Sequence, residues 1–138
     1  MAQFLIQRKS KSLELKGIEA CQSGMMSEAH ALLTEAMEAA PRRPSCHNNR
    51  AQVLRLQGRS DEALLDLGRA LELSGARGRT GCQALVQRAS IHRKDGREDD
   101  AIEDFRELSA LQFRLIFTRD LYFFATCLSF LANSLLTS

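Results

Sequence analysis

Prolines are rare in this chain, and the motifs that mark catalytic centres are absent from it. Only Pro41 and Pro44 occur among the 138 residues, which allows long uninterrupted helices. The sequence contains no glycine-rich phosphate loop, no nucleophile elbow and no paired-carboxylate motif. His30, His47 and His92 have no partner at a catalytic spacing, and we expect the last two to pack in the core. These absences argue against an enzyme.

Cysteine pairs at short spacing are also missing. The four cysteines are Cys21, Cys46, Cys82 and Cys127, which lie 25, 36 and 45 residues apart. No Cys-x-x-Cys pair is present, and only His47, beside Cys46, stands near a thiol in the sequence. This spacing predicts isolated thiols in a reducing compartment rather than a metal site. We therefore expect no cofactor and no metal.

The chain has little net charge and no long apolar run at its start. A formal net charge of +2 is too small to require a nucleic acid or an anionic membrane as partner. The first eleven residues hold an apolar run of only three, Phe4 to Ile6. A secretory signal needs an apolar region of ~7–15 residues. We expect a cytoplasmic protein, with the nucleus as a second compartment.

What the chain does contain is a glycine followed five residues later by an alanine, three times over. The pairs are Gly24 with Ala29, Gly58 with Ala63, and Gly96 with Ala101. The first step is 34 residues and the second is 38. Apolar residues recur around each glycine at helical spacing, as in Ala29, Leu32, Leu33 and Ala36. A period near 34 predicts helix–turn–helix repeats that stack into an all-α solenoid.

The period divides the chain into an N-terminal extension, three repeats and a tail. The extension covers residues 1–9, the repeats cover residues 10–43, 44–81 and 82–113, and the tail covers residues 114–138. Each repeat is expected to contribute two antiparallel helices, which gives six helices in three stacked pairs. A stacked solenoid presents a concave surface rather than a catalytic cleft.

Several residues predict where the second helix of a repeat begins and ends. Ser27 and Ser60 are expected to be N-caps, because a serine oxygen can accept from the free N–H groups of the first turn. Pro41 and Gly75 are expected to end these helices. The segment 75–81 carries the four extra residues of the longer step, and its three glycines predict a longer loop.

Eight positions of each unit carry a common pattern of small and large residues. In the first unit they are Leu13, Gly17, Ala20, Gly24, Ala29, Leu33, Ala36 and Pro41; in the second, His47, Ala51, Leu54, Gly58, Ala63, Leu67, Ala70 and Gly75; in the third, Leu85, Ala89, His92, Gly96, Ala101, Phe105, Leu108 and Phe113. This pattern resembles that of the tetratricopeptide repeat family. The resemblance implies an all-α fold, a right-handed α-solenoid of three repeats. The uncharged, Phe- and Leu-rich tail adds the expectation of a C-terminal apolar helix.

A closer resemblance is to a small three-repeat member of this family that is described as an Hsp70-binding protein. It is carried by residues 12–17, 48–52, 55–58, 72–75, 86–88 and 96–101. The resemblance does not cover the start of the chain or the part beyond about Leu108. It implies an intracellular adaptor with Hsp70 as a candidate partner.

The register of the family places a set of polar side chains toward the concave groove. They are Asn48, Asn49, Gln52, Arg55, Gln83, Gln87, Ser90 and Arg93. One interpretation is a groove that hydrogen-bonds an extended or helical peptide. The other is a solvated helical face, and the sequence leaves both open.

Many family members hold the terminal carboxylates of Hsp70 or Hsp90 in a clamp of Lys, Asn and Arg side chains. The matching positions here are Glu14, Ile18, Asn49, Gln83 and Gln87, of which Asn49 alone keeps the clamp residue. Glu14 is an anion and would repel a carboxylate. We therefore expect any Hsp70 contact to use another geometry.

A group of cations surrounds the second inter-repeat segment. They are Arg77, Arg79, Arg88, Arg93, Lys94 and Arg97. Nucleic-acid binding would need such a patch with interleaved aromatic residues for stacking, and none is interleaved here. No nucleic-acid partner is expected, because solvated ion pairs explain these residues more simply.

The tail from Leu121 to Ser138 contains no charged residue and is rich in Phe and Leu. It could cap the last repeat, anchor in a membrane, or be an alternative terminus without a selected function. An anchor is disfavoured because Leu121–Leu136 is shorter than the usual ~20 residues and contains Thr126, Ser129, Asn133 and Ser134.

Together these patterns predict a non-catalytic protein–protein interaction adaptor, with an Hsp70 co-chaperone as the specific form. The main alternative is a tail-anchored membrane adaptor that uses the apolar C-terminus. A nucleic-acid binder is a weaker alternative.

Overall fold

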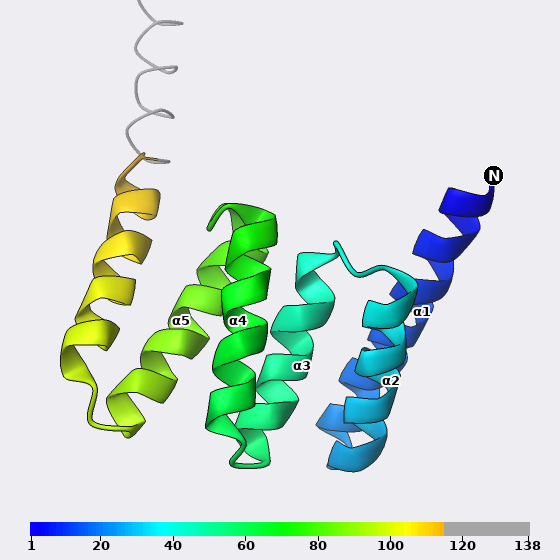
Figure 1. The fold of residues 1–138 in the computed structure, drawn as a ribbon, viewed down its shortest axis with the longest axis horizontal. Coiled ribbons are helices and arrows are strands. Elements are labelled where there is room, and N and C mark those ends of the chain that lie inside the picture. Colours follow the sequence, from blue (N-terminus) through cyan, green and yellow to red (C-terminus); the bar gives the residue numbers. More distant parts are fainter. Residues whose placement is uncertain (115–138) are drawn as a thin grey trace, which may run out of the picture.

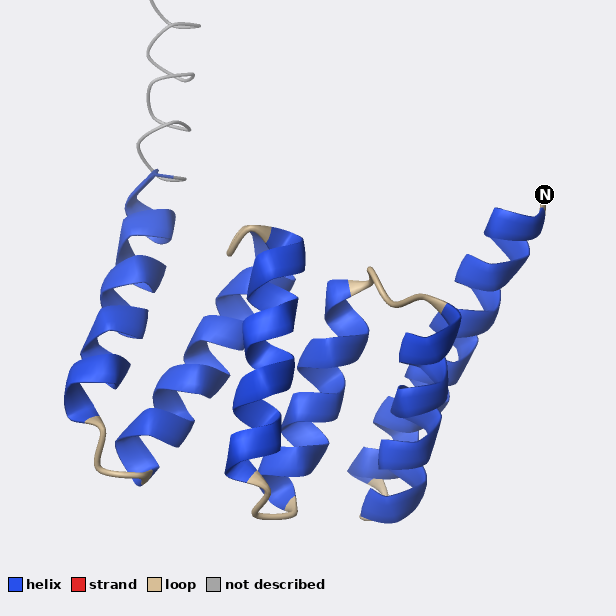
Figure 2. Cartoon of the chain, in the orientation of Figure 1, coloured by secondary structure: helices blue, strands red, loops and turns tan. Residues whose placement is uncertain are grey.

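The computed structural model describes residues 1–114, and every regular element in this part is a helix (Figure 1, Figure 2). The five labelled helices are α1 (Ala2–Gln22), α2 (Met26–Ala39), α3 (Pro44–Leu56), α4 (Ser60–Ser74) and α5 (Gly78–Lys94). Residues 98–114 form a further helical stretch, which we call the sixth helix. Consecutive helices lie side by side in a row of pairs (Figure 1). The predicted all-α solenoid is confirmed for the described residues.

The predicted N-terminal extension lies within the described residues, and the predicted C-terminal helix does not. Residues 2–9 are part of α1, so the N-terminal extension is helical and continuous with the first repeat. The predicted apolar C-terminal helix lies, beyond Arg114, outside the described residues. No helix in the described part of the chain is long and apolar enough to cross a membrane.

The repeated glycines make the turn inside each repeat. Gly24, Gly58 and Gly96 have φ values of +80°, +77° and +74°, which a residue with a side chain rarely adopts. In each repeat the backbone N–H of the residue that follows the glycine donates a hydrogen bond to a backbone carbonyl in the last turn of the preceding helix. These bonds are Met25 to Ala20, Arg59 to Leu54 and Arg97 to His92, at 2.8–2.9 Å. The 34-residue signal therefore reports a helix end closed by a glycine.

Both predicted serine caps are wrong. The N-cap of α2 is Met25, that of α4 is Arg59, and neither helix has a side-chain capping bond. The glycine turn determines this outcome, because its backbone bonds place the first helical residue two positions after the glycine. Ser60 is consequently the first residue of α4 rather than its cap.

The four extra residues of the second step lengthen a helix rather than a loop, which corrects the prediction for segment 75–81. Helix α5 has 17 residues where α3 has 13, and the two helices end at the same distance from their turn glycines. Gly75 does end α4 as predicted, in the left-handed conformation at φ 61°. A Cβ on Gly81 would lie 2.5 Å from the carbonyl carbon of Ala76. The extra turn therefore packs against the preceding loop only because position 81 has no side chain.

Small residues occur where the first helix of each repeat meets the second. Gly17, Ala51 and Ala89 occupy the same place in the three repeats and are buried. A Cβ on Gly17 would lie 2.7 Å from Cγ of Leu33, which is itself fully buried. The close approach of the two helices explains why the pattern requires a small residue here.

Two apolar clusters form the core. The larger one lies in the second and third repeats and consists of Ala51, Leu54, Ala63, Leu67, Ala70, Leu71, Ala84, Leu85 and Ile91. The smaller one consists of Ala20, Ala29, Leu33 and Val53. Because Val53 belongs to α3, it joins the first repeat to the second.

Candidate functional site

A pocket of about 390 Å³ lies between α3, α5 and the sixth helix. Its lining is mostly amide side chains over a few apolar ones: Asn48, Asn49, Gln52, Arg55, Cys82, Gln83, Val86, Gln87, Leu108 and Gln112. Six of the eight polar residues predicted for the concave groove are in this set. Ser90 and Arg93 are not, because they lie further along α5 toward its C-terminal end.

A second, smaller pocket of about 100 Å³ continues the hollow toward α1. It is lined by Ile18, Cys21, Gln22, Leu33, Asn49, Gln52 and Val53. Asn49 and Gln52 line both pockets, so the two are neighbours along α3. The described residues therefore form one groove that runs from α1 across α3 to the sixth helix, and we call it the α3 groove.

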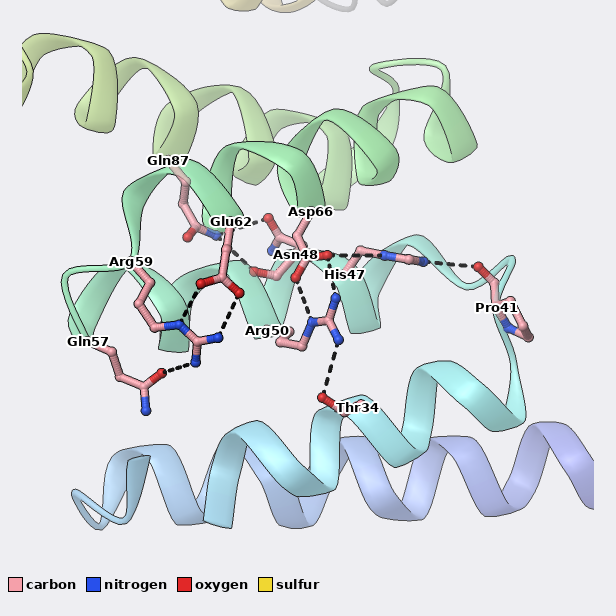
Figure 3. Close-up of polar contacts among 10 residues, drawn as sticks. All are labelled: Thr34, Pro41, His47, Asn48, Arg50, Gln57, Arg59, Glu62, Asp66 and Gln87. Atoms are coloured by element: carbon pink, nitrogen blue, oxygen red, sulfur yellow. Dashed lines mark hydrogen bonds and ion pairs between the residues drawn. The ribbon is translucent and has the colours of Figure 1, made fainter. Parts of the chain in front are cut away.

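Asn48 and Gln87 tie the two helices of the groove together (Figure 3). Asn48 is only 3% exposed. The amide nitrogen of Gln87 donates to the Asn48 side-chain oxygen over 2.9 Å and reaches the Asn48 carbonyl at 3.4 Å. An amide that satisfies another amide across 39 residues fixes the spacing of α3 and α5. Asn48 thus forms the floor of the groove.

Asn49 is already bonded to a carboxylate of this chain. Its amide nitrogen donates to Oε1 of Glu14 over 2.8 Å. Nη2 of Arg43 lies 2.8 Å from the other oxygen, Oε2, of the same carboxylate. Glu14 is 5% exposed, so it faces the interior between α1 and α3 rather than open solvent. The anion expected to repel a bound carboxylate is present, and it is paired internally.

Two polar atoms of residues that line the α3 groove lack a hydrogen-bond partner in the described part of the chain. Within residues 1–114 neither Nε of Arg55 nor Oε1 of Gln87 has a hydrogen-bond partner, although both are shielded from solvent. A buried polar atom without a partner costs roughly 1–3 kcal/mol. One atom is a donor and the other an acceptor, so a bound group with a carbonyl and an N–H could satisfy both after a rotamer change.

Comparisons with known proteins show which family this chain resembles. No family model matches the chain. Over 103 residues the chain is 48% identical to tetratricopeptide repeat protein 36 of Homo sapiens, a match that covers 75% of this chain and 54% of that protein.

The chain belongs to the tetratricopeptide repeat family. It spans about half the length of the curated relatives it matches. Among solved structures, the second tetratricopeptide domain of Spaghetti (RPAP3) bound to the HSP90 peptide SRMEEVD has a TM-score of 0.71. The match has 22% identity and covers 80% of this chain and 97% of that one. MamA has a TM-score of 0.73 at 12% identity, with 80% and 62% covered.

In the second tetratricopeptide repeat a buried polar cluster joins the two helices (Figure 3). Arg50 donates to both oxygens of Asp66, over 2.7 and 2.8 Å. Nδ1 of His47 lies 3.8 Å from the same carboxylate, and its Nε2 lies 3.0 Å from the carbonyl of Pro41. The contact to Pro41 satisfies one ring nitrogen of His47, as expected for a core histidine.

The third repeat has an equivalent cluster. Nε of Arg88 donates to Asp104 over 2.9 Å, and Nε2 of His92 lies 3.9 Å from that carboxylate. Sequence reasoning missed both clusters. The available signal was an arginine followed 16 residues later by an aspartate, twice, at the 38-residue step. The first repeat has Lys16 and Leu32 in the corresponding places.

The pKa of Asp66 reflects its position inside the protein. Burial by itself would raise that pKa, because the charged form loses its water. The hydrogen bonds from Arg50, with a smaller contribution from the nearby His47 ring, outweigh the burial and hold the pKa of Asp66 below its ordinary value. The carboxylate is therefore charged and structural, and it does not line the α3 groove.

The predicted cationic group around the second inter-repeat segment is smaller than the sequence suggested. Arg88 is bonded to the buried Asp104, and Arg97 lies 2.8 Å from Asp100. The first contact pairs Arg88 with a buried carboxylate and leaves its side chain 28% exposed, so its charge is compensated within the protein. Among the described residues no three His, Cys, Asp or Glu side chains come together as a metal site.

Proposed function

We propose that this chain is a non-catalytic protein-interaction adaptor that binds a partner segment in the α3 groove. The observation that carries the proposal is the lining of the groove. Residues chosen from the repeat register alone, on α3 and on α5, lie around one pocket of about 390 Å³. A cavity of this size accommodates a few side chains of a peptide, and its mixed lining of amide and apolar side chains suits a mixed segment.

The chemistry of the groove favours an uncharged polar segment over a terminal carboxylate. Arg55 is the one cation among the described lining residues, and Gln83 and Gln87 are neutral where a clamp would need cations. Asn49 is committed to Glu14. A main-chain amide or an Asn or Gln side chain offers the carbonyl and the N–H that match Arg55 and Gln87. Such a ligand needs no charge at all.

Filling the mouth of the pocket tests this proposal. Gln83 is exposed, so Gln83→Arg adds bulk to the lining without disturbing the core. We expect affinity capture with the full chain to recover partners that Gln83→Arg loses. Leu65→Ser is the matched control, since Leu65 is 76% exposed on α4 and does not line the groove. Partners that bind all three chains equally would contradict the use of this groove.

Hsp70 is the specific partner we propose to test, bound without a carboxylate clamp. A charge-assisted hydrogen bond contributes about 1.5–3 kcal/mol, so the neutral Gln83 and Gln87 should weaken a tail peptide by orders of magnitude. We expect full-length Hsp70 to bind and a peptide of its acidic C-terminus to bind weakly. Tight peptide binding that is abolished by Asn49→Ala would contradict this geometry. If neither binds, Hsp70 is removed as a partner while the adaptor proposal still has the Gln83→Arg test.

A further inference from the structure

Helix α1 extends well beyond its partner. It has 21 residues where α2 has 14, and its N-terminal turns project past the end of α2 (Figure 1). Every residue from 1 to 9 is exposed, and Ser10 is the first buried one. Ser10, Glu14 and Gly17 face the rest of the solenoid at a spacing of four and three residues. The opposite face of α1 has no partner in the described part of the chain.

This outer face combines large apolar side chains with cations. Phe4, Leu5 and Leu15 are 64%, 56% and 58% exposed. The cations on this face are Arg8 and Lys11, and Lys9 and Lys16 lie at its edge toward α2; all four are exposed. Positions 4, 8, 11 and 15 follow one another at helical spacing, so they lie on one face of α1.

Acidic groups near this face are few. The carboxylates of α1 are Glu14, which is buried against Arg43, and Glu19, in the last two turns of the helix. Lys9 lies 3.5 Å from Glu35 of α2, and both are exposed. The part of α1 that carries Phe4 and Leu5 therefore keeps a net positive charge.

We propose that this outer face of α1 lies on a lipid bilayer whose surface carries anionic headgroups. Phe and Leu on a helix with flanking Lys and Arg is the composition of helices that lie in a membrane interface. Each juxtamembrane cation adds attraction to anionic lipid, while the long lysine stems let their charges reach the headgroups.

The shape of this surface selects a bilayer over a peptide. A single projecting helix is a convex ridge without walls, so it offers a peptide no groove, whereas it can enter a planar interface along its length. The face is opposite the residues with which α1 packs on the solenoid, and none of its residues lines the α3 groove. Membrane attachment and partner binding would thus use separate surfaces.

Vesicle co-sedimentation of the full chain tests the proposal. We expect binding to vesicles of phosphatidylcholine mixed with phosphatidylserine to exceed binding to pure phosphatidylcholine by about tenfold or more, and to fall with salt. The double variant Phe4→Ser, Leu5→Ser should lose about tenfold in partitioning, because both apolar side chains leave the interface. Lys11→Gln should lose about fivefold. Leu65→Ser and Arg106→Gln, exposed on α4 and on the sixth helix, should change nothing.

A spectroscopic variant separates insertion from simple charge attraction. The chain has no tryptophan, so Phe4→Trp introduces a single reporter. Its emission should shift to the blue with anionic vesicles and stay unchanged with neutral ones. Equal binding to both vesicle types, binding unaffected by the Phe4 and Leu5 changes, or no binding at all would each overturn the proposal. Salt-sensitive binding to an acidic protein or a nucleic acid, together with no blue shift of the Phe4→Trp emission on anionic vesicles, would also overturn it.

Discussion

At the scale of single residues, this protein keeps a charged carboxylate inside a solenoid by surrounding it with donors. Asp66 is 6% exposed, and Arg50 meets both of its oxygens. Losing one member of such a pair leaves the other uncompensated, which is costlier than the pair itself is stabilising. The surface pair of Arg69 and Glu72 has the same chemistry without the burial.

Asp66→Asn should therefore destabilise the protein by about 2–3 kcal/mol, because Arg50 is left without its counter-charge. Urea unfolding at neutral pH measures this change. Glu72→Gln is the control, and it should cost less than about 0.5 kcal/mol because the Arg69–Glu72 pair is solvated. Equal effects for the two variants would mean that the buried pair contributes nothing special.

The pH dependence of stability follows from the direction of the Asp66 shift. Its pKa is lower in the folded protein than in the unfolded chain, so the stabilisation is fully present above the ordinary Asp pKa of about 4. It is lost as the pH falls through the folded-state value. We expect Asp66→Asn to flatten the loss of stability in acid, as measured by urea midpoints at several pH values.

Cys46 is a second residue whose surroundings change its chemistry. Burial first, and then the negative charge of Glu14, raise the pKa of the Cys46 thiol. In a Cys127→Ser background, Ellman's reagent at mildly alkaline pH should react quickly with Cys21 and Cys82, which are partly exposed, and slowly with Cys46. Cys46→Ser should remove the slow phase alone. A single fast phase for all three thiols would contradict this assignment.

At the scale of elements, the helices are positioned by residues that have no side chain. Gly17 lets α1 approach Leu33 of α2, and Gly81 lets the extra turn of α5 approach the loop at Ala76. Gly68, in the middle of α4, has no atom within 4 Å of an added Cβ. The same residue type thus has a packing role in two helices and none in a third.

This difference predicts opposite signs for the same substitution. Gly17→Ala should destabilise the protein by about 1–2 kcal/mol, because overpacking against Leu33 exceeds the gain in helix propensity. Gly68→Ala should stabilise it by about 0.5–1 kcal/mol through propensity alone. Thermal and urea unfolding of both variants check the signs. A stabilising Gly17→Ala would show that α1 and α2 can separate without cost.

At the scale of the whole molecule, the repeats are unequal. In the described residues, the apolar cluster of the second and third repeats has nine buried residues. The cluster of the first repeat has four, and one of these is Val53 of α3. The buried arginine–aspartate pair is also confined, in the described residues, to the second and third repeats. In a solenoid each repeat is stabilised by itself and its neighbours, so the first repeat, which has one neighbouring repeat and no buried arginine–aspartate pair in the described residues, opens more easily than the second.

Native-state hydrogen exchange should therefore show two levels of protection. We expect the amides of α1 and α2 to exchange through an opening of lower free energy than those of α3, α4 and α5. Low concentrations of denaturant should promote the first opening before global unfolding. Uniform protection across all five helices would mean that the solenoid opens as one unit.

The number of repeats and their helix–turn–helix plan were determined by the sequence alone. Each of these depends on local rules, a glycine at positive φ and apolar residues at helical spacing, which act over a few residues. The register of a helix fixes the direction of its side chains, which is why Asn48 and Gln83, predicted to share one surface, line the same pocket.

Only the tertiary structure decided which side chains meet. Asn49 is bonded to Glu14, and Arg50 to Asp66, across 35 and 16 residues of chain. The four extra residues between the second and third repeat glycines form a turn of α5, because Gly81 can pack on Ala76. The composition of the segment does not reveal this contact. Partners of this kind depend on the distance between helices after packing, and a one-dimensional pattern does not contain that distance.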